Sequence, residues 1–291
     1  MNSPASASPS YFGQTAAIRC ERAAAELRAG RPVVISDGRQ RLASIALDSS
    51  SPEGYAAFAE AAQGRHYLFL SAARAQTLGI NAANGIHLPL ADRAFAELPA
   101  LAYLRDAIAP ADAQTNGNVL DAATVEVARL GLLLPAMISV ELDAAGSPFD
   151  DCLQLDTTAL YEGAGQAGQD YELVTRSPVP LRDVGMSEFA VFRGGVAQRD
   201  QVAVIVGNPD MSGIVPVRVH SSCLTGDLFG SLKCDCGDQL RRGLRTLKEL
   251  GGGILLYLDQ EGRGTGIAAK MRAYGYQHEG LDLSLIHISE P

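Results

Sequence analysis

The chain has 291 residues, of which 47% are hydrophobic and 20% are charged, and its formal net charge is −9 at pH 7. This much apolar material can form a packed core, so the composition excludes a chain that is disordered throughout. The acidic balance argues against a broad basic surface for nucleic acid, and no run of about 18 apolar residues predicts a membrane span.

Residues 1–15 have neither the basic nor the apolar region of a secretory signal, and we interpret them as a disordered tail. The chain contains five cysteines, an odd number that argues against a framework of disulfide bonds. Both observations favour a reducing, cytoplasmic location. Three of the five, Cys223, Cys234 and Cys236, lie within fourteen residues.

The first half of the sequence alternates predicted helices with predicted strands. Helices are expected over 16–29, 52–63, 72–80 and 122–133, and strands over 32–36, 66–71 and 136–142. Asp37 and Gly38 form a turn signal after the first strand. This alternation predicts an α/β or α+β domain, to which we assign residues 16–175.

A stretch rich in glycine and proline between residues 150 and 185 predicts a domain boundary. Strands are expected beyond it at 190–194, 201–207, 214–220 and 254–258, and helices at 237–250 and 267–277. In the first of these helices Leu240, Leu244 and Leu247 form one apolar stripe. The glycine-rich segment 259–266 joins a strand to a helix, an order in which phosphate often meets free backbone N–H groups. We assign residues 176–282 to this second domain.

The spacing of Cys223, Cys234 and Cys236 favours a metal site. Three thiolates with an open fourth position are typical of catalytic zinc, which activates a bound water. The alternative is a set of free buried cysteines, which are common in proteins of the cytoplasm. His220 is either a fourth ligand or a structural histidine at the end of a strand.

Two arginines and a glutamate accompany the cysteines. Arg218 precedes the cluster, and Glu261 and Arg263 belong to the glycine-rich segment. Arginine suits phosphate oxygens, and a carboxylate can accept hydrogen bonds from a purine. The alternative for the segment is a solvated loop with an ion pair, because its glycine pattern matches neither a P-loop nor a dinucleotide fingerprint.

The runs RVHSSCLTGDLFGSLKCDCGDQL (218–240) and GGGILLYLDQEGRGTGIAAKMRAYGYQ (251–277) resemble GTP cyclohydrolase II. The resemblance implies that Cys223, Cys234 and Cys236 bind Zn²⁺ and that Tyr274 lies near the reacting base. It implies that magnesium accompanies the nucleotide. The implied contacts with GTP are Arg218, Val219, His220, Ser221, Ser222, Gln239, Glu261, Gly262 and Arg263.

The family reaction is hydrolytic. Water activated by the zinc attacks C8 of the guanine, the imidazole ring opens, and formate and pyrophosphate leave, which begins riboflavin synthesis. The resemblance also implies a homodimer. An alternative is a non-catalytic fragment or regulatory module that binds zinc and nucleotide.

Two departures from the family pattern stand out. Ser222 occupies a position where the family usually has glutamate. The resemblance also stops near residue 282, whereas the family continues with an aspartate general base and an arginine nucleophile. We therefore expect a domain truncated at its C-terminus, low or no turnover, and a non-native tail over 283–291.

Residues 17–150 resemble, more faintly, 3,4-dihydroxy-2-butanone 4-phosphate synthase. The resemblance rests on AAAELRAGRPVVISD, HYLFLSAARAQTLGI and ARLGLLLPAMISVELD. The acidic loop of that family is reduced here to Asp37, too few oxygen ligands for Mg²⁺. The family's catalytic histidine is missing, and we interpret His66 and His87 as structural. The predicted molecule is α+β (mixed α/β), with an inactive synthase-like domain before the cyclohydrolase domain.

Overall fold

The computed structural model describes residues 15–104, 107–143, 147–166, 171–194 and 200–278. The predicted tails therefore lie outside the described residues, apart from Thr15, which caps the first helix through its side chain. The chain divides into two compact units. One comprises Met1–Gly131 and Pro135–Ala167, and the other Leu132–Leu134 and Gly168–Pro291.

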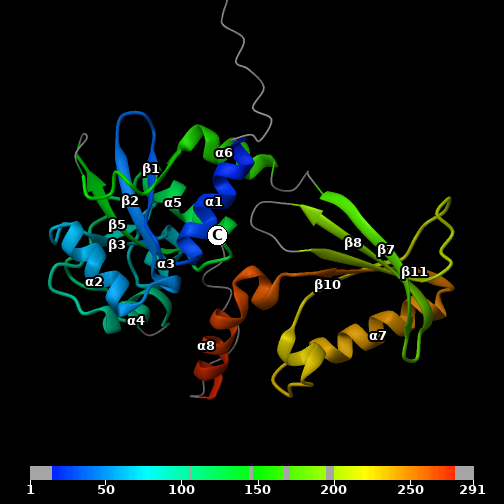
Figure 1. Cartoon of the computed structure of the whole chain (residues 1–291). Helices are drawn as coiled ribbons and strands as arrows, with labels where there is room; N and C mark the ends of the chain where they lie inside the picture. Colours follow the sequence, from blue (N-terminus) through cyan, green and yellow to red (C-terminus); the bar gives the residue numbers. More distant parts are fainter. Residues whose placement is uncertain (1–14, 105–106, 144–146, 167–170, 195–199, 279–291) are drawn as a thin grey trace, which may run out of the picture. The chain divides into compact units, whose positions relative to one another are not determined.

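The first unit is built around a six-stranded sheet of order β4-β3-β5-β2-β1-β6 (Figure 1). All neighbouring strands are antiparallel except β1 and β6, so the unit is α+β. Its strands are β1 (Val33–Ser36), β2 (Arg41–Ala46), β3 (Tyr67–Leu70), β4 (Ile86–Pro89), β5 (Ala136–Leu142) and β6 (Leu153–Asp156). Its α-helices are α1 (Ala16–Arg28), α2 (Pro52–Ala61), α3 (Ala72–Thr77), α4 (Leu98–Tyr103), α5 (Val119–Leu130) and α6 (Thr157–Gln166).

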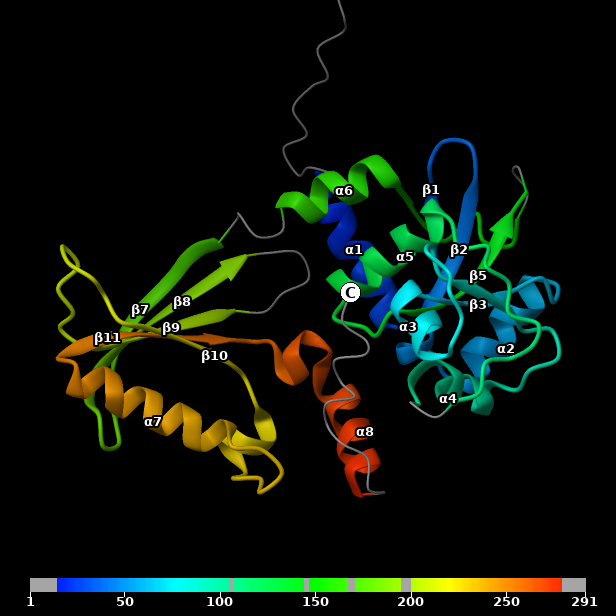
Figure 2. The same ribbon diagram turned by 180° about the vertical axis from the view of Figure 1, so that it is seen from behind.

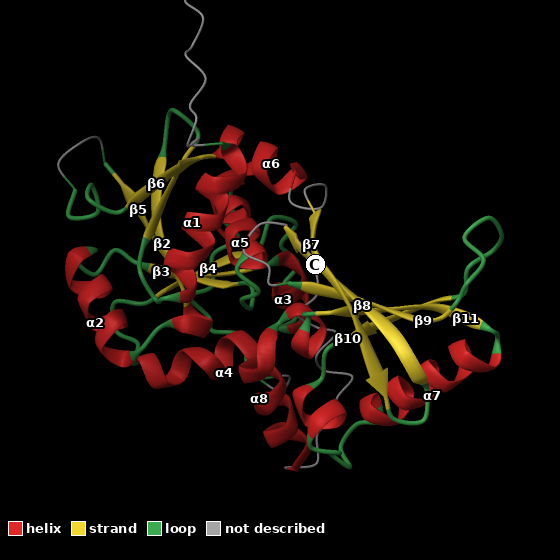
Figure 3. Cartoon of the chain, turned by 45° about the vertical axis from the view of Figure 1, so that its right-hand side comes forward, coloured by secondary structure: helices red, strands yellow, loops and turns green. Residues whose placement is uncertain are grey.

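Helices cover both faces of this sheet (Figure 3). Alternate strand residues such as Val34, Ile45 and Ile138 share one core with Phe58 of α2 and Leu98 of α4. The residues between them point to the opposite face, because side chains alternate along a strand. Helices α1 and α5 contact the strands there. The near-continuous apolar strands of the sequence thus reflect burial on two sides.

A buried polar network lies within this unit. The Asp121 carboxylate accepts hydrogen bonds from Tyr67 Oη at 2.9 Å and from the Asn118 backbone N–H at 3.0 Å, and His87 Nε2 lies 2.7 Å from it. Asp121 is fully buried, and the His87 ring stacks on Tyr67. The Asn118 side chain in turn accepts from the N–H groups of Leu120 and Asp121, which completes a capping box at the start of α5.

The second unit has a five-stranded sheet of order β10-β11-β9-β8-β7, in which β7 and β8 form a long hairpin (Figure 2). Only the pair β10 and β11 is parallel. The strands are β7 (Tyr171–Leu181), β8 (Gly185–Gly194), β9 (Gln201–Gly207), β10 (Val217–Ser221) and β11 (Gly252–Leu258). The helical elements are a π-helical turn (Leu224–Leu228), α7 (Cys236–Glu249), a 3-10 turn (Glu261–Gly264) and α8 (Gly266–His278).

Helix α7 packs on this sheet through its leucine stripe. Leu247 is buried beside Leu255 of β11 and Val206 of β9, and Leu240 and Leu244 pack against the same cluster. The predicted stripe is confirmed. This packing holds the N-terminal end of α7, where Cys236 begins the helix, beside strand β10.

The fold class, a mixed α+β chain with two units, is confirmed. Strand β7 starts at Tyr171 and pairs with β8, so the second sheet includes residues that precede 176, where the second domain is expected to begin. Segment 259–266 contains a 3-10 turn where an irregular loop was expected. Among the described residues, no helix combines the length and the apolar character needed to cross a membrane.

We predict that Asp121→Ala lowers the free energy of unfolding by about 3–5 kcal/mol, because it leaves buried partners without their acceptor. The exposed Asp92→Ala variant is the matched control and should stay within about 0.5 kcal/mol of the parent. Urea denaturation followed by circular dichroism measures both. A loss below about 1 kcal/mol for Asp121→Ala would contradict a structural role for the network.

Candidate functional site

Three cysteines of the second unit converge at one point. Cys223 follows β10 and caps the π-helical turn, Cys234 lies in the following connection, and Cys236 begins α7. Their sulfur atoms all lie within 4.8 Å of one another, and the Sγ atoms of Cys223 and Cys234 are 3.6 Å apart. Within the described chain this is the only group of three or more His, Cys, Asp or Glu residues with metal-ligand spacing.

Gly226 makes this convergence sterically feasible. A β-carbon built on Gly226 would lie 2.9 Å from Cys234 Sγ, 2.9 Å from Cys236 Cβ and 3.0 Å from Cys223 Sγ. The backbone also approaches closely at Gly237, where a β-carbon would lie 2.2 Å from the Gly226 carbonyl oxygen. Only glycine leaves room at these positions for three sulfurs to gather, so the site is a cradle formed by the local backbone.

The three thiols do not share one electrostatic environment. Burial opposes ionisation of Cys223, but hydrogen bonds from Lys270, Thr225 and the Gly226 N–H prevail and lower its pKa to about 7. Burial and the neighbouring sulfurs raise the pKa of Cys236 to about 12. Ionisation of Cys223 is therefore favoured over ionisation of Cys236, and a bound cation would offset the repulsion between their thiolates.

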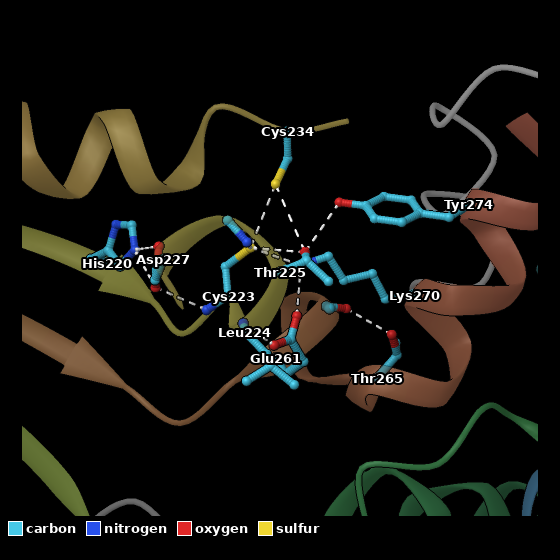
Figure 4. A network of polar contacts seen from close by, with 12 residues as sticks. His220, Cys223, Leu224, Thr225, Asp227, Cys234, Glu261, Thr265, Lys270 and Tyr274 are labelled. Atoms are coloured by element: carbon cyan, nitrogen blue, oxygen red, sulfur yellow. Dashed lines mark hydrogen bonds and ion pairs between the residues drawn. The ribbon is translucent and has the colours of Figure 1, made fainter. Parts of the chain in front are cut away.

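This donor set suits a soft divalent metal. Thiolates select zinc and related ions over Mg²⁺ or Ca²⁺, which prefer oxygen. Three cysteines supply three of the four ligands of a tetrahedral site, the number that leaves a position for water or substrate. Thr225 Oγ1 borders the cluster, 3.6 Å from Cys223 Sγ and 3.5 Å from Tyr274 Oη (Figure 4).

Among the described residues His220 is not a member of the metal-ligand group, and it pairs with Asp227 instead. Its ring Nε2 lies 3.2 Å from both carboxylate oxygens of Asp227, and the ring stacks on Tyr257. Asp227 also accepts hydrogen bonds from Tyr257 Oη at 2.9 Å and from the Cys223 N–H at 3.0 Å. The geometry favours the structural alternative for His220, because its partner fixes the backbone of Cys223 and its ring is only 4% exposed.

Glu261 is held by protein donors on both oxygens. Its Oε2 accepts from the Leu224 N–H at 2.6 Å, and its Oε1 accepts from Lys270 Nζ at 2.7 Å. The same Nζ lies 2.8 Å from Cys223 Sγ. Glu261 thus joins the 3-10 turn to the π-helical turn beside the cysteines, and its contact with guanine stays a prediction.

Arg218 and Gln239, each predicted to contact GTP, lie next to one another. Arg218 is exposed on β10 and donates to Gln239 Oε1 at 3.0 Å. The stem of Arg218 crosses α7 at Gly243, where a β-carbon would lie 3.3 Å from Arg218 Cγ. An exposed guanidinium thus lies at the start of the helix that carries Cys236.

The remaining predicted residues lie on β10, directly after it, or in the 3-10 turn. Val219 and Ser221 are exposed on β10, and Gly262 lies in the 3-10 turn with a φ of +61°. Ser222 Oγ is buried and has no hydrogen-bond partner among the described residues. Of Arg263 the structure describes the backbone only.

Sequence reasoning missed two charged residues of the site, Lys270 and Asp227. Lys270 lies 47 positions from Cys223 and looks like an ordinary helical lysine. The single signal was its place in helix 267–277, directly after the glycine-rich segment. Asp227 lies only four residues after Cys223, so the spacing inside the motif could have revealed it.

The polar residues noted in the first unit have structural partners. Asp37 Oδ1 accepts from the N–H groups of Arg39 and Gln40, so one oxygen of this exposed carboxylate is bonded to the turn backbone. Arg41 pairs with Asp150 at 2.7 Å. His66 is buried with its Nε2 3.2 Å from Tyr55 Oη, and burial lowers its pKa.

Comparison with known proteins identifies relatives. A family model described as GTP cyclohydrolase II matches residues 172–286. The chain is 60% identical over 285 residues to "GTP cyclohydrolase-2" of Xylella fastidiosa (strain 9a5c), covering 97% of this chain and 71% of the relative. It is 48% identical over 101 residues to "Riboflavin biosynthesis protein RibBA" of Bacillus cytotoxicus, covering 33% of this chain and 25% of that protein.

Among solved structures, the chain aligns with RibBX, a two-domain 3,4-dihydroxy-2-butanone 4-phosphate synthase from A. baumannii. The TM-score is 0.39 at 20% identity, with 90% of this chain and 88% of that chain covered.

We predict that Gly226→Ala lowers the affinity of the cysteine cluster for Zn²⁺ or Co²⁺ by at least about tenfold, because the added methyl group displaces the sulfurs. Competition with a chromophoric chelator measures the affinity. The matched control is Gly165→Ala, a helical position where a β-carbon meets open space. Equal affinity of Gly226→Ala and the parent would refute the assigned cradle.

Proposed function

This chain belongs to the GTP cyclohydrolase II family of hydrolases, and from that premise we propose that it is a zinc-dependent enzyme that opens the guanine imidazole ring of GTP. The proposed products are a diaminopyrimidine phosphate, formate and pyrophosphate, in the service of riboflavin biosynthesis. The observation that carries the proposal is the convergence of three cysteines around Gly226, beside an exposed arginine and a glycine-rich turn.

Cys223, Cys234 and Cys236 would hold the zinc. When bound there, zinc supplies a Lewis acid and a water of lowered pKa, the chemistry required for hydrolysis at a ring carbon. The residues present fit this ion, because the donor set is sulfur and Gly226 leaves room at its centre.

The nucleotide would extend from this cluster over β10 and the start of α7. Arg218 offers a guanidinium to phosphate oxygens, and Gln239 is within hydrogen-bond distance to orient it. The buried Ser222 Oγ offers a donor and acceptor that the described residues leave unused. Backbone N–H groups near Gly262 provide further donors of the kind that bind phosphate.

Tyr274 is proposed as the residue that meets the reacting base. Its hydroxyl lies 3.5 Å from Thr225 Oγ1, on the border of the cysteine cluster. Burial and the Cys234 sulfur raise the pKa of Tyr274, so the phenol keeps its proton at neutral pH. Tyr274 therefore serves as a hydrogen-bond donor to substrate and not as a base.

Glu261 is proposed to act indirectly. Its two oxygens are engaged by Leu224 and Lys270, so it holds the turn that approaches the nucleotide. Magnesium with the triphosphate and a homodimer are further proposals drawn from the family. The first unit is proposed to be an inactive synthase-like domain, because its one turn carboxylate, Asp37, is already bonded to backbone.

The decisive measurement is formate release from GTP by the purified full chain, with bound zinc assayed on the same sample. We expect about one zinc per chain, held by the three cysteines. Formate release that increases in proportion to the amount of bound zinc establishes the enzyme. Zinc binding and GTP binding without formate would instead support a non-catalytic zinc- and nucleotide-binding module. A chain that binds neither overturns the proposal.

We predict that Arg218→Ala weakens GTP binding by about tenfold to a hundredfold, because it removes a charge-assisted contact worth about 1.5–3 kcal/mol. The loss should be much smaller for guanosine, which lacks the phosphates. Arg245→Ala, an exposed position on α7, is the control. Equilibrium dialysis gives both affinities, and equal losses for GTP and guanosine would exclude a phosphate role for Arg218.

A further inference from the structure

Lys270 is a buried cation with two anionic partners. Its residue is 7% exposed, and Nζ lies 2.8 Å from Cys223 Sγ and 2.7 Å from Glu261 Oε1. It also lies 5.7 Å from the centre of the Tyr274 ring (Figure 4). Lysine is almost never fully buried unless it is paired, so the position is retained for its charge and its donors.

These contacts close a ring between two turns. Cys223 and Leu224 are consecutive residues at the start of the π-helical turn. Lys270 binds the first through its sulfur, Glu261 binds the second through its N–H, and Lys270 and Glu261 bind each other. A shift of the 3-10 turn must therefore move the Cys223 sulfur as well, since both are held by the same Nζ.

The charge of the cluster gives Lys270 a second role. Three thiolates around a divalent ion carry a net charge of −1, from three negative charges and two positive ones. The Nζ hydrogen bond draws electron density from one sulfur and compensates this charge inside a largely buried site. Lys233 cannot replace it, because its Nζ is bonded to the Tyr274 carbonyl and its side chain is exposed.

We propose that Lys270 is a positioning residue that links the metal-binding thiolate of Cys223 to Glu261 of the 3-10 turn Glu261–Gly264, here called the nucleotide turn. Metal binding and GTP binding are then coupled through one ammonium group. The inference rests on the proposed metal site. It assigns Lys270 no contact with substrate. The coupling is reciprocal: GTP should tighten metal binding by the same factor by which metal tightens GTP binding.

The test compares Lys270→Met and Lys270→Arg with the parent full chain. Met keeps the stem and removes the charge and both donors, whereas Arg keeps the charge. Lys248→Met is the control. Lys248 is exposed near the C-terminal end of α7, and its Nζ donates to the Asp183 carbonyl oxygen. Chelator competition gives the Zn²⁺ affinity, and cobalt substitution gives the thiolate-to-metal charge-transfer band.

We expect Lys270→Met to lower metal affinity by about tenfold to a hundredfold, the usual effect of removing a group that supports a metal ligand. Its cobalt charge-transfer band should move to lower energy, because the Cys223 thiolate loses a hydrogen bond. Lys270→Arg should recover most of both properties. GTP should tighten zinc binding in the parent and in Lys248→Met, and this linkage should vanish in Lys270→Met.

A Lys270→Met chain with parental zinc affinity, band position and linkage overturns the inference while leaving the proposed function intact. A parent chain that binds no metal overturns the proposed function itself, so the two failures are distinguishable. If Lys270→Met does not fold, Glu261→Gln takes its place. It weakens the Lys270 contact without altering a cysteine, and unchanged linkage in that variant overturns the inference.

Discussion

The second unit depends on the close approach of backbone at Gly226 and Gly237. The three sulfur atoms lie within 4.8 Å of one another, a β-carbon at Gly226 would crowd the three cysteines, and one at Gly237 would collide with the Gly226 carbonyl oxygen. The π-helical turn is the local result, because it folds the chain back from Cys223 toward Cys236 within a few residues. The leucine stripe holds helix α7 on the sheet, and this packing places Cys236 beside β10.

Two sets of polar contacts surround the cysteine cluster, one centred on Asp227 and the other on Lys270. Asp227 gathers His220, Tyr257 and the Cys223 N–H, which anchors the cluster to β10 and β11. Lys270 instead anchors it to the elements that follow β11. Removal of either set would leave buried groups without partners, which costs more than the contacts themselves contribute. The cluster is therefore tied to the sheet through Asp227 and to the 3-10 turn and α8 through Lys270.

The sequence predicted the parts of this site that are local. Cys223, Cys234 and Cys236 lie close along the chain, so their spacing alone indicates a shared ligand. Lys270 could not be found in this way, since its partner is 47 residues distant and a lysine in a helix is ordinarily solvated. Glu261 was predicted to contact guanine, and a sequence cannot show that its oxygens also accept hydrogen bonds from the Leu224 N–H and Lys270 Nζ. Similarly, strand β7 was not predicted, because the glycines and prolines of residues 150–185 suggested a domain boundary there.

In the first unit, by contrast, the described polar network around Asp121 is buried in the core. Asp121 is saturated by Tyr67, His87 and the start of α5, so its carboxylate is part of the core. One oxygen of the Asp37 carboxylate is bonded to the turn backbone. The relative from Xylella fastidiosa is 60% identical over an aligned span of 285 residues, which includes residues of both units. The polar network around Asp121 belongs to the core of the first unit, whereas the chemistry proposed for the chain lies at the cysteines of the second unit.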